Sequence, residues 1–68
     1  MMNLVRVTEE EFKRWQALDT YHRAQVFTIA DCQNFYDEER KVIARHSFGG
    51  LPHIYEIRED QLSKEAGE

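Results

Sequence analysis

The sequence predicts one small domain of the α+β class, in which a helix covers an antiparallel sheet. A helix-start signal lies near the N-terminus, and several segments rich in β-branched and aromatic residues follow it. Leu, Ile, Val and Phe make up 16 of the 68 residues, which is about 24% and above the roughly 20% below which a chain tends to be disordered. We therefore expect a folded domain over residues 1–60 and a polar, frayed tail over residues 61–68, where a short helix from Asp60 is an alternative.

The N-terminal third contains a short strand and the clearest helix start. Residues 3–7 alternate around Leu4, Val5 and Val7 and predict the strand. Thr8, followed three residues later by Glu11, forms a capping box, in which each side chain binds a free backbone N–H. An apolar stripe at helical spacing follows, formed by Phe12, Trp15 and Leu18. The pattern predicts a helix over about residues 9–19, or to residue 24 because no glycine ends it earlier.

The remainder of the chain predicts a three-stranded antiparallel meander packed on this helix. Residues 24–32 contain four consecutive strand-favouring residues and predict the first strand. Residues 34–39 resemble a turn, and residues 40–47 predict the second strand. Two glycines and Pro52 mark the next turn. Alternation over residues 53–58 predicts the third strand.

Pairing within the last hairpin places apolar residues on one face. If His46 lies opposite His53, one face collects the apolar side chains of the hairpin. These residues are Val42, Ala44, Tyr55 and Ile57. The helix is the natural cover for such a face. An alternative architecture converts residues 21–36 into a second helix and leaves only the C-terminal hairpin as sheet.

Composition excludes several classes of function. The formal net charge is −4 and the pI is near 5.3, which argues against broad binding to a phosphate backbone. No apolar run approaches the roughly 18–20 residues of a membrane span, and the N-terminus lacks the features of a signal peptide. Cys32 is the single cysteine, so no intramolecular disulfide forms. We expect a cytoplasmic protein in a reducing environment.

No sequence motif predicts catalysis or a cofactor. Phosphate-binding loops, serine-nucleophile elbows and metalloprotease motifs are absent. By residue type, four residues could be zinc ligands: His22, Cys32, His46 and His53. Their spacing matches no common zinc pattern. His46 and His53 are the candidate metal ligands or pH-sensitive pair, because the expected hairpin brings them together. Adjacent histidines more often pack or face solvent, so we expect no metal, no cofactor and no enzymatic activity.

The surplus of aromatic residues favours protein binding. Exposed aromatic side chains beside arginine are typical of protein contact sites. The candidate contact patch and the neighbouring acidic residues are Tyr36, Arg40, Phe48, Tyr55, Asp37, Glu38 and Glu39. These residues predict a small acidic binding or regulatory module that acts on another protein, by analogy with inhibitors encoded by phages and mobile elements. A sharper version of this hypothesis is mimicry of nucleic acid by the carboxylates.

Two alternatives belong to other classes. The aromatic and basic side chains of the sheet could stack bases, which would make the chain a nucleic-acid-binding domain. The histidines and Cys32 could make it a metal-binding protein. An open sheet also leaves two unpaired edges, so a second copy of the chain is a candidate partner.

Overall fold

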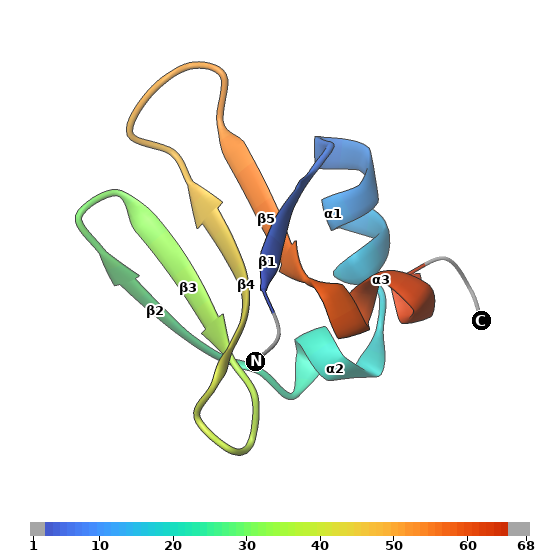
Figure 1. Cartoon of the computed structure of the whole chain (residues 1–68). Coiled ribbons are helices and arrows are strands. Elements are labelled where there is room, and N and C mark those ends of the chain that lie inside the picture. Colours follow the sequence, from blue (N-terminus) through green and yellow to red (C-terminus); the bar gives the residue numbers. More distant parts are fainter. Residues whose placement is uncertain (1–2, 66–68) are drawn as a thin grey trace.

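The computed structural model describes residues 3–65 and confirms the α+β class (Figure 1). Within these residues, five strands form one antiparallel sheet and three short helices pack against it. The strands are β1 (Leu4–Val7), β2 (Gln25–Ile29), β3 (Cys32–Tyr36), β4 (Val42–Ser47) and β5 (Ile54–Arg58). The helices are α1 (Glu9–Trp15), α2 (Asp19–His22) and α3 (Glu59–Glu65). None of these helices is long and apolar enough to cross a membrane.

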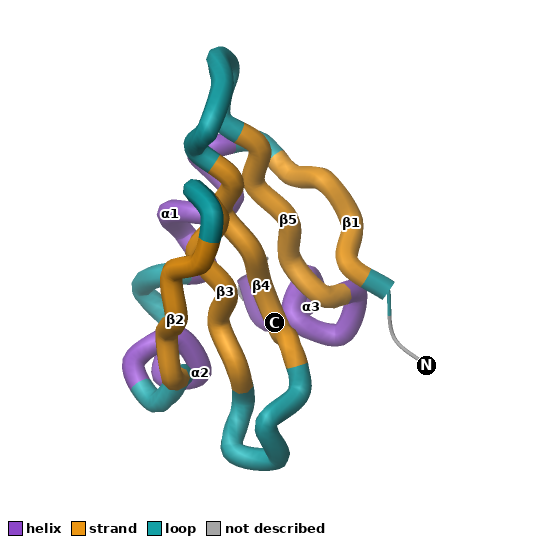
Figure 2. Tube along the Cα trace, turned by 90° about the vertical axis from the view of Figure 1, so that its left-hand side faces the viewer, coloured by secondary structure: helices purple, strands orange, loops and turns teal. Residues whose placement is uncertain are grey.

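The sheet has the strand order β1-β5-β4-β3-β2. Strands β2 to β5 form a meander in which each strand pairs with the next, and β1 adds to the far side of β5. In Figure 2 the sheet faces the viewer and the helices lie behind it. The described helices therefore cover one face of the sheet and leave the other uncovered.

The predicted capping box starts α1. The backbone N–H of Glu11 donates to Oγ1 of Thr8 at 3.1 Å, and the backbone N–H of Thr8 donates to Oε1 of Glu11 at 2.8 Å. The predicted single helix over residues 9–19 is instead divided into α1 and α2. After Trp15 the chain makes a turn in which the Trp15 carbonyl accepts from the N–H of Leu18. The backbone of Leu18 itself is extended. Leu18 packs against the core from this bend.

The core lies between α1 and the covered face of the sheet. Its buried hydrophobic residues are Phe12, Trp15, Phe35, Ile43, Ala44 and Ile57. Trp15 contacts Phe12 and Phe35 with ring centroids 5.4 Å apart in each pair. Burial of each large side chain contributes about 1.5–3 kcal/mol, so the helix face identified in the sequence provides much of the core.

The single strand predicted over residues 24–32 is wrong. Two strands, β2 and β3, are joined there by a two-residue turn at Ala30 and Asp31. Both turn residues have positive φ, 52° and 60°, which tight hairpins require and which Asn or Gly usually supplies. The predicted turn over residues 34–39 accordingly moves to residues 37–41, and the three-stranded meander becomes four-stranded. The alternative helix over residues 21–36 is also wrong.

The last hairpin shifts its register by two residues. Ala44, Tyr55 and Ile57 keep the predicted face, but Ile43 rather than Val42 enters the core. His46 pairs with Tyr55 and Ala44 pairs with Ile57, whereas the sequence argument placed His46 opposite His53. A shift of two preserves which side of a strand faces the core. A bulge in the β3–β4 pairing leaves Ile43 without a directly opposed partner, and this residue is fully buried.

The C-terminal segment packs on the domain. The expected boundary at residue 60 lies inside α3, and Gln61 is only 2% exposed. Leu62 also packs against the core. The end of the expected tail, residues 66–68, lies outside the described residues.

Candidate protein-interaction site

Strand β2 is an exposed edge of the sheet. It pairs only with β3, and all five of its residues are exposed. Three of them are large and apolar: Val26 is 42% exposed, Phe27 54% and Ile29 65%. No residue from Gln25 to Ile29 is charged, although 32% of the chain is. This strand therefore lacks the charges by which natural proteins protect sheet edges.

The backbone of β2 offers hydrogen-bonding groups to a further strand. Ile29 and Cys32 flank the two-residue turn and face each other, which makes them a hydrogen-bonded pair. Because an antiparallel ladder alternates, residues 25, 27 and 29 direct their N–H and C=O groups toward β3. Val26 and Thr28 direct theirs away from the sheet. We call the exposed side chains of Val26, Phe27 and Ile29, with the outward backbone groups of Val26 and Thr28, the edge patch.

The edge patch is accessible from both faces of the sheet. Phe27 and Ile29 lie on the uncovered face, where Phe27 contacts Tyr36 with ring centroids 5.7 Å apart. Val26 lies opposite Phe35 and belongs to the covered face, yet it stays exposed. Helices α1 and α3 pack on β5, and β2 forms the opposite edge (Figure 2). Helix α2 lies beside the start of β2 on the covered side (Figure 2), so a partner strand meets no helix on the uncovered face of this edge.

The other edge of the sheet differs in character. Strand β1 has four residues and carries Arg6 on the uncovered face, directly opposite Glu56 of β5. The carbonyl of Asn3 just before β1 accepts from the N–H of Glu59 at 3.0 Å. The shorter length and the charge make β1 the less favourable edge for strand addition.

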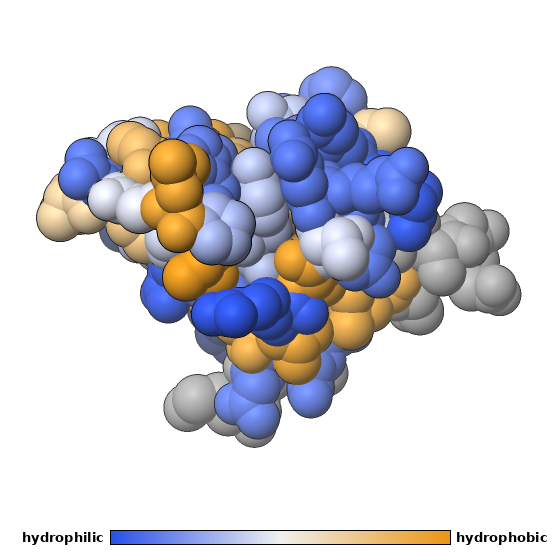
Figure 3. Space-filling view, turned by 90° about the horizontal axis from the view of Figure 1, so that it is seen from above, coloured by the Kyte–Doolittle hydropathy of each residue, from blue (hydrophilic) through white to orange (hydrophobic). Residues whose placement is uncertain are grey.

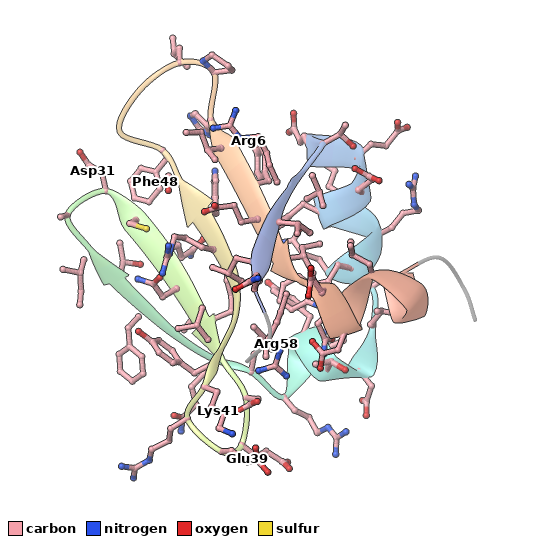
Figure 4. The ribbon with its side chains drawn as sticks, in the orientation of Figure 1. Arg6, Asp31, Glu39, Lys41, Phe48 and Arg58 are labelled. Atoms are coloured by element: carbon pink, nitrogen blue, oxygen red, sulfur yellow. The ribbon has the colours of Figure 1, made fainter. Side chains whose placement is uncertain are left out.

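The residues of the predicted contact patch lie on different parts of the structure. Tyr36 lies on the uncovered face of β3, whereas Tyr55 faces the helices and contacts Phe12 at 5.2 Å between ring centroids. Phe48 follows β4 at the end of the molecule where its N–H donates to the carbonyl of Asp31 (Figure 4). Arg40 lies in the β3–β4 turn with a φ of 67°. The four residues do not form one surface.

The predicted acidic residues at the β3–β4 turn have different environments. Asp37 points inward, and its Oδ1 accepts from the backbone N–H groups of Glu39 and Lys41 at 2.8 and 2.9 Å. The bond from Lys41 is the largest cause of the lowered pKa of Asp37. Glu38 and Glu39 are exposed and lie 3.9 Å from Arg23 and 3.7 Å from Lys41, respectively. Nearby cations therefore offset the negative field expected for nucleic-acid mimicry.

A hollow of about 300 Å³ beside this turn is lined mainly by paired charges. Arg58 binds both oxygens of Asp60, at 2.7 and 3.0 Å, and one oxygen of Asp37 at 3.3 Å (Figure 4). The bonds to Asp60 raise the pKa of Arg58, and the same bonds lower the pKa of Asp60. This network joins β5, α3 and the β3–β4 turn, so it fits a structural role.

The two candidate histidines do meet. Nε2 of His46 lies 3.0 Å from Nδ1 of His53, and the His46 ring stacks on Tyr55 with centroids 4.6 Å apart. Burial lowers the pKa of His46, and the neighbouring His53 lowers it further, while Glu9 opposes this effect. Cys32 lies on the other face of the sheet, 3.5 Å from Oγ of Ser47. In the described part of the chain, no three His, Cys, Asp or Glu residues form a metal-binding group.

The basic and aromatic face predicted for nucleic acid is also interrupted. Arg45 donates to Oδ1 of Asn34 at 2.8 Å and lies opposite Glu56. Figure 3 shows hydrophobic surface interspersed with hydrophilic residues at the end of the molecule that carries the β4–β5 loop. Leu51 in this loop is 92% exposed. On the predicted face, Arg45 therefore lies beside an amide and a carboxylate rather than within a basic cluster.

Comparison with known proteins adds no family. No protein-family model matches the chain, and searches of curated proteins and of solved structures found no significant match. Open sheet edges were predictable from the sequence, but the identity of the exposed strand was not. Recognition of the turn at Ala30 and Asp31 would have identified Gln25–Ile29 as a hairpin strand.

Proposed function

We propose that this chain is a non-enzymatic protein-interaction module that binds a partner by extending its sheet at β2. In this mode, a strand of the partner pairs with the outward N–H and C=O groups of Val26 and Thr28. The partner's side chains then cover Phe27 and Ile29 on the uncovered face. The module regulates or assembles its partner because β2 pairs with a strand of that partner and occupies it.

The single observation that carries this proposal is the combination of free backbone and apolar side chains on one uncharged edge. Val26, Phe27 and Ile29 are three of the four large hydrophobic residues exposed among the described residues. Backbone pairing supplies affinity in strand addition, and the alternating side chains supply selectivity. The other candidate groups, Arg58 and His46, already have partners inside the chain. A cytoplasmic location, where Cys32 stays reduced, is part of the proposal.

Selection from a displayed peptide library on the immobilised chain tests the proposal. The wild type should enrich extended peptides rich in β-branched and aromatic residues. Thr28→Lys should abolish their binding, because it places a charge on the edge. Ala17→Lys is the matched control, since Ala17 is exposed away from the sheet and the charge change is the same. Failure to enrich any peptide, or equal binding by Thr28→Lys, would contradict the proposal.

A further inference from the structure

We propose that the strand paired with β2 is β2 of a second copy, so that two chains form one continuous ten-stranded antiparallel sheet. This inference rests on the proposed function and names its partner. The two copies are related by a two-fold axis that passes between the two Phe27 residues. Val26 of each copy then lies opposite Thr28 of the other.

The free backbone groups permit this register. Val26 and Thr28 carry the outward N–H and C=O groups. A symmetric antiparallel pair must therefore place Val26 of one copy opposite Thr28 of the other, or one of these residues opposite the same residue of the other copy. The arrangement centred on Phe27 pairs Val26 with Thr28 twice and uses all four outward N–H groups of the two strands. It also overlaps all five residues of each strand. Registers centred on Val26 or Thr28 overlap fewer residues and extend into the turn or the chain before β2.

The side chains are self-complementary in the same register. The two Phe27 side chains meet on the uncovered face at a non-hydrogen-bonded pair, where side chains approach most closely. Ile29 of each copy lies opposite the uncharged Gln25 of the other. Val26 and Thr28 face each other on the side of the helices. Three exposed apolar side chains per copy would thus leave water together.

Charges at the ends of β2 also favour a second copy. Arg23 precedes the strand by two residues, and Asp31 follows it by two. Both are exposed. Antiparallel pairing brings the basic start of each strand to the acidic end of the other, so two complementary pairs flank the apolar centre. The net charge of −4 per chain opposes association elsewhere, but no charge lies within the strand itself.

Cysteine cross-linking tests the register. In a Cys32→Ser background, proteins carrying Val26→Cys and Thr28→Cys are oxidised separately and as a mixture. Directly opposed residues have Cα atoms about 5.5 Å apart, within disulfide range, whereas residues displaced by two positions are about 7–8 Å apart. The mixture should therefore form the disulfide dimer, and each protein alone should not. Phe27→Cys alone should also form it, since its Cα separation is about 4.5 Å.

Sedimentation equilibrium without cysteine variants provides the second measurement. The weight-average mass of the wild type should rise from 8.1 kDa toward twice that value as concentration increases. Thr28→Lys should remain at the monomer mass, and Ala17→Lys should behave like the wild type. A dimer whose cross-links form with Val26→Cys alone or with Thr28→Cys alone would overturn the register.

The outcomes separate this inference from the proposed function. A wild type that stays monomeric at millimolar concentration, yet binds selected peptides in a manner abolished by Thr28→Lys, would overturn the second copy and keep sheet extension. A dimer that persists in Thr28→Lys would overturn the second copy at β2, and it would overturn sheet extension as well if Thr28→Lys also bound the selected peptides like the wild type. Dimerisation abolished by Thr28→Lys, together with cross-linking of the mixture, would establish both.

Discussion

The indole N–H of Trp15 donates to the side-chain oxygen of Gln61 at 3.3 Å, inside the protein. Trp15 is fully buried and Gln61 is 2% exposed. The bond joins α1 to α3, which are separated by most of the chain. It explains why a polar residue occupies the interior, because a buried indole N–H without a partner is costly.

Because of this bond, substitutions of Trp15 and Gln61 should affect stability in a non-additive way. Gln61→Leu should lower the free energy of unfolding by about 1–3 kcal/mol, since the Trp15 N–H loses its acceptor. Trp15→Phe removes the donor to Oε1 of the buried Gln61 and should also destabilise the protein. In a double-mutant cycle measured by urea unfolding, the double variant should lose less than the sum of the two losses. Strict additivity would show that the bond contributes nothing.

The capping box predicts a second loss. Thr8→Ala removes the acceptor for the N–H of Glu11, so the free energy of unfolding should fall by about 0.5–2 kcal/mol. Thr8→Ser retains the hydroxyl and serves as the control. Thermal denaturation followed by circular dichroism measures both. Equal melting temperatures for Thr8→Ala and the wild type would contradict the role of the cap.

The β2–β3 turn predicts a gain in stability. Ala30 has a φ of 52°, which costs an L-residue other than glycine about 1–2 kcal/mol. Ala30→Gly removes that strain and should raise the midpoint of urea unfolding. Ala17→Gly is the control, because Ala17 has no positive φ and glycine there increases only the freedom of the unfolded chain. The two substitutions should change stability in opposite directions. A lower midpoint of urea unfolding in both variants would refute the strained turn.

The histidine pair predicts that stability falls with acidity. The pKa of His46 is lowered in the folded state, so the unfolded chain binds a proton more readily below its usual pKa of about 6.5. The contribution of His46 to the free energy of unfolding is therefore at its maximum above that pH. It decreases as the pH falls toward the pKa of the folded state and is constant at lower pH. His46→Asn should remove this decline, and His53→Asn should weaken it. Urea unfolding between neutral and mildly acidic pH provides the measurement, and an unchanged slope in His46→Asn would contradict it.

The Arg58 network predicts a second pH dependence at lower pH. The bonds from Arg58 are the largest cause of the lowered pKa of Asp60, whereas the pKa of Asp37 is lowered mainly by the Lys41 N–H and less by Arg58. The stabilisation by both carboxylates is therefore present above about pH 4 and is lost as the pH falls through their folded pKa values. Arg58→Met should reduce stability at neutral pH and make acid unfolding shallower. Lys13→Met, which removes an exposed ion pair with Glu9, should change little. Parallel acid-unfolding curves for Arg58→Met and the wild type would contradict the network.

Local signals made part of the fold predictable. Thr8 and Glu11 specify the helix start within four residues, and the spacing of Phe12 and Trp15 identifies the face that enters the core. The turn at Ala30 and Asp31 gives no such signal, because neighbouring strands hold these residues at positive φ. The bend at Leu18 and the packing of α3 likewise depend on contacts distant in sequence.

The sequence predicted the type of site, a protein-interaction surface, but not the residues that form it. Surplus aromatic residues and open edges indicated an interaction surface, but the missed turn concealed the strand that forms it. The strand predicted over residues 24–32 did not say which of its side chains face the helices, and the structure places Phe27 and Ile29 on the uncovered face. Tyr55, expected in the contact patch, packs on Phe12 instead. A one-residue difference in strand register exchanges the two faces of a strand, so side-chain exposure requires the register.

The most direct test of strand addition at β2 is amide hydrogen exchange of Val26 and Thr28, resolved by NMR at increasing protein concentration and with selected peptide. The account predicts rapid exchange of both amides in the dilute monomer and slowing as the partner strand binds, while Phe27, already bonded to β3, stays protected throughout. Unchanged rapid exchange of Val26 and Thr28 under every condition, despite measurable association, would contradict it.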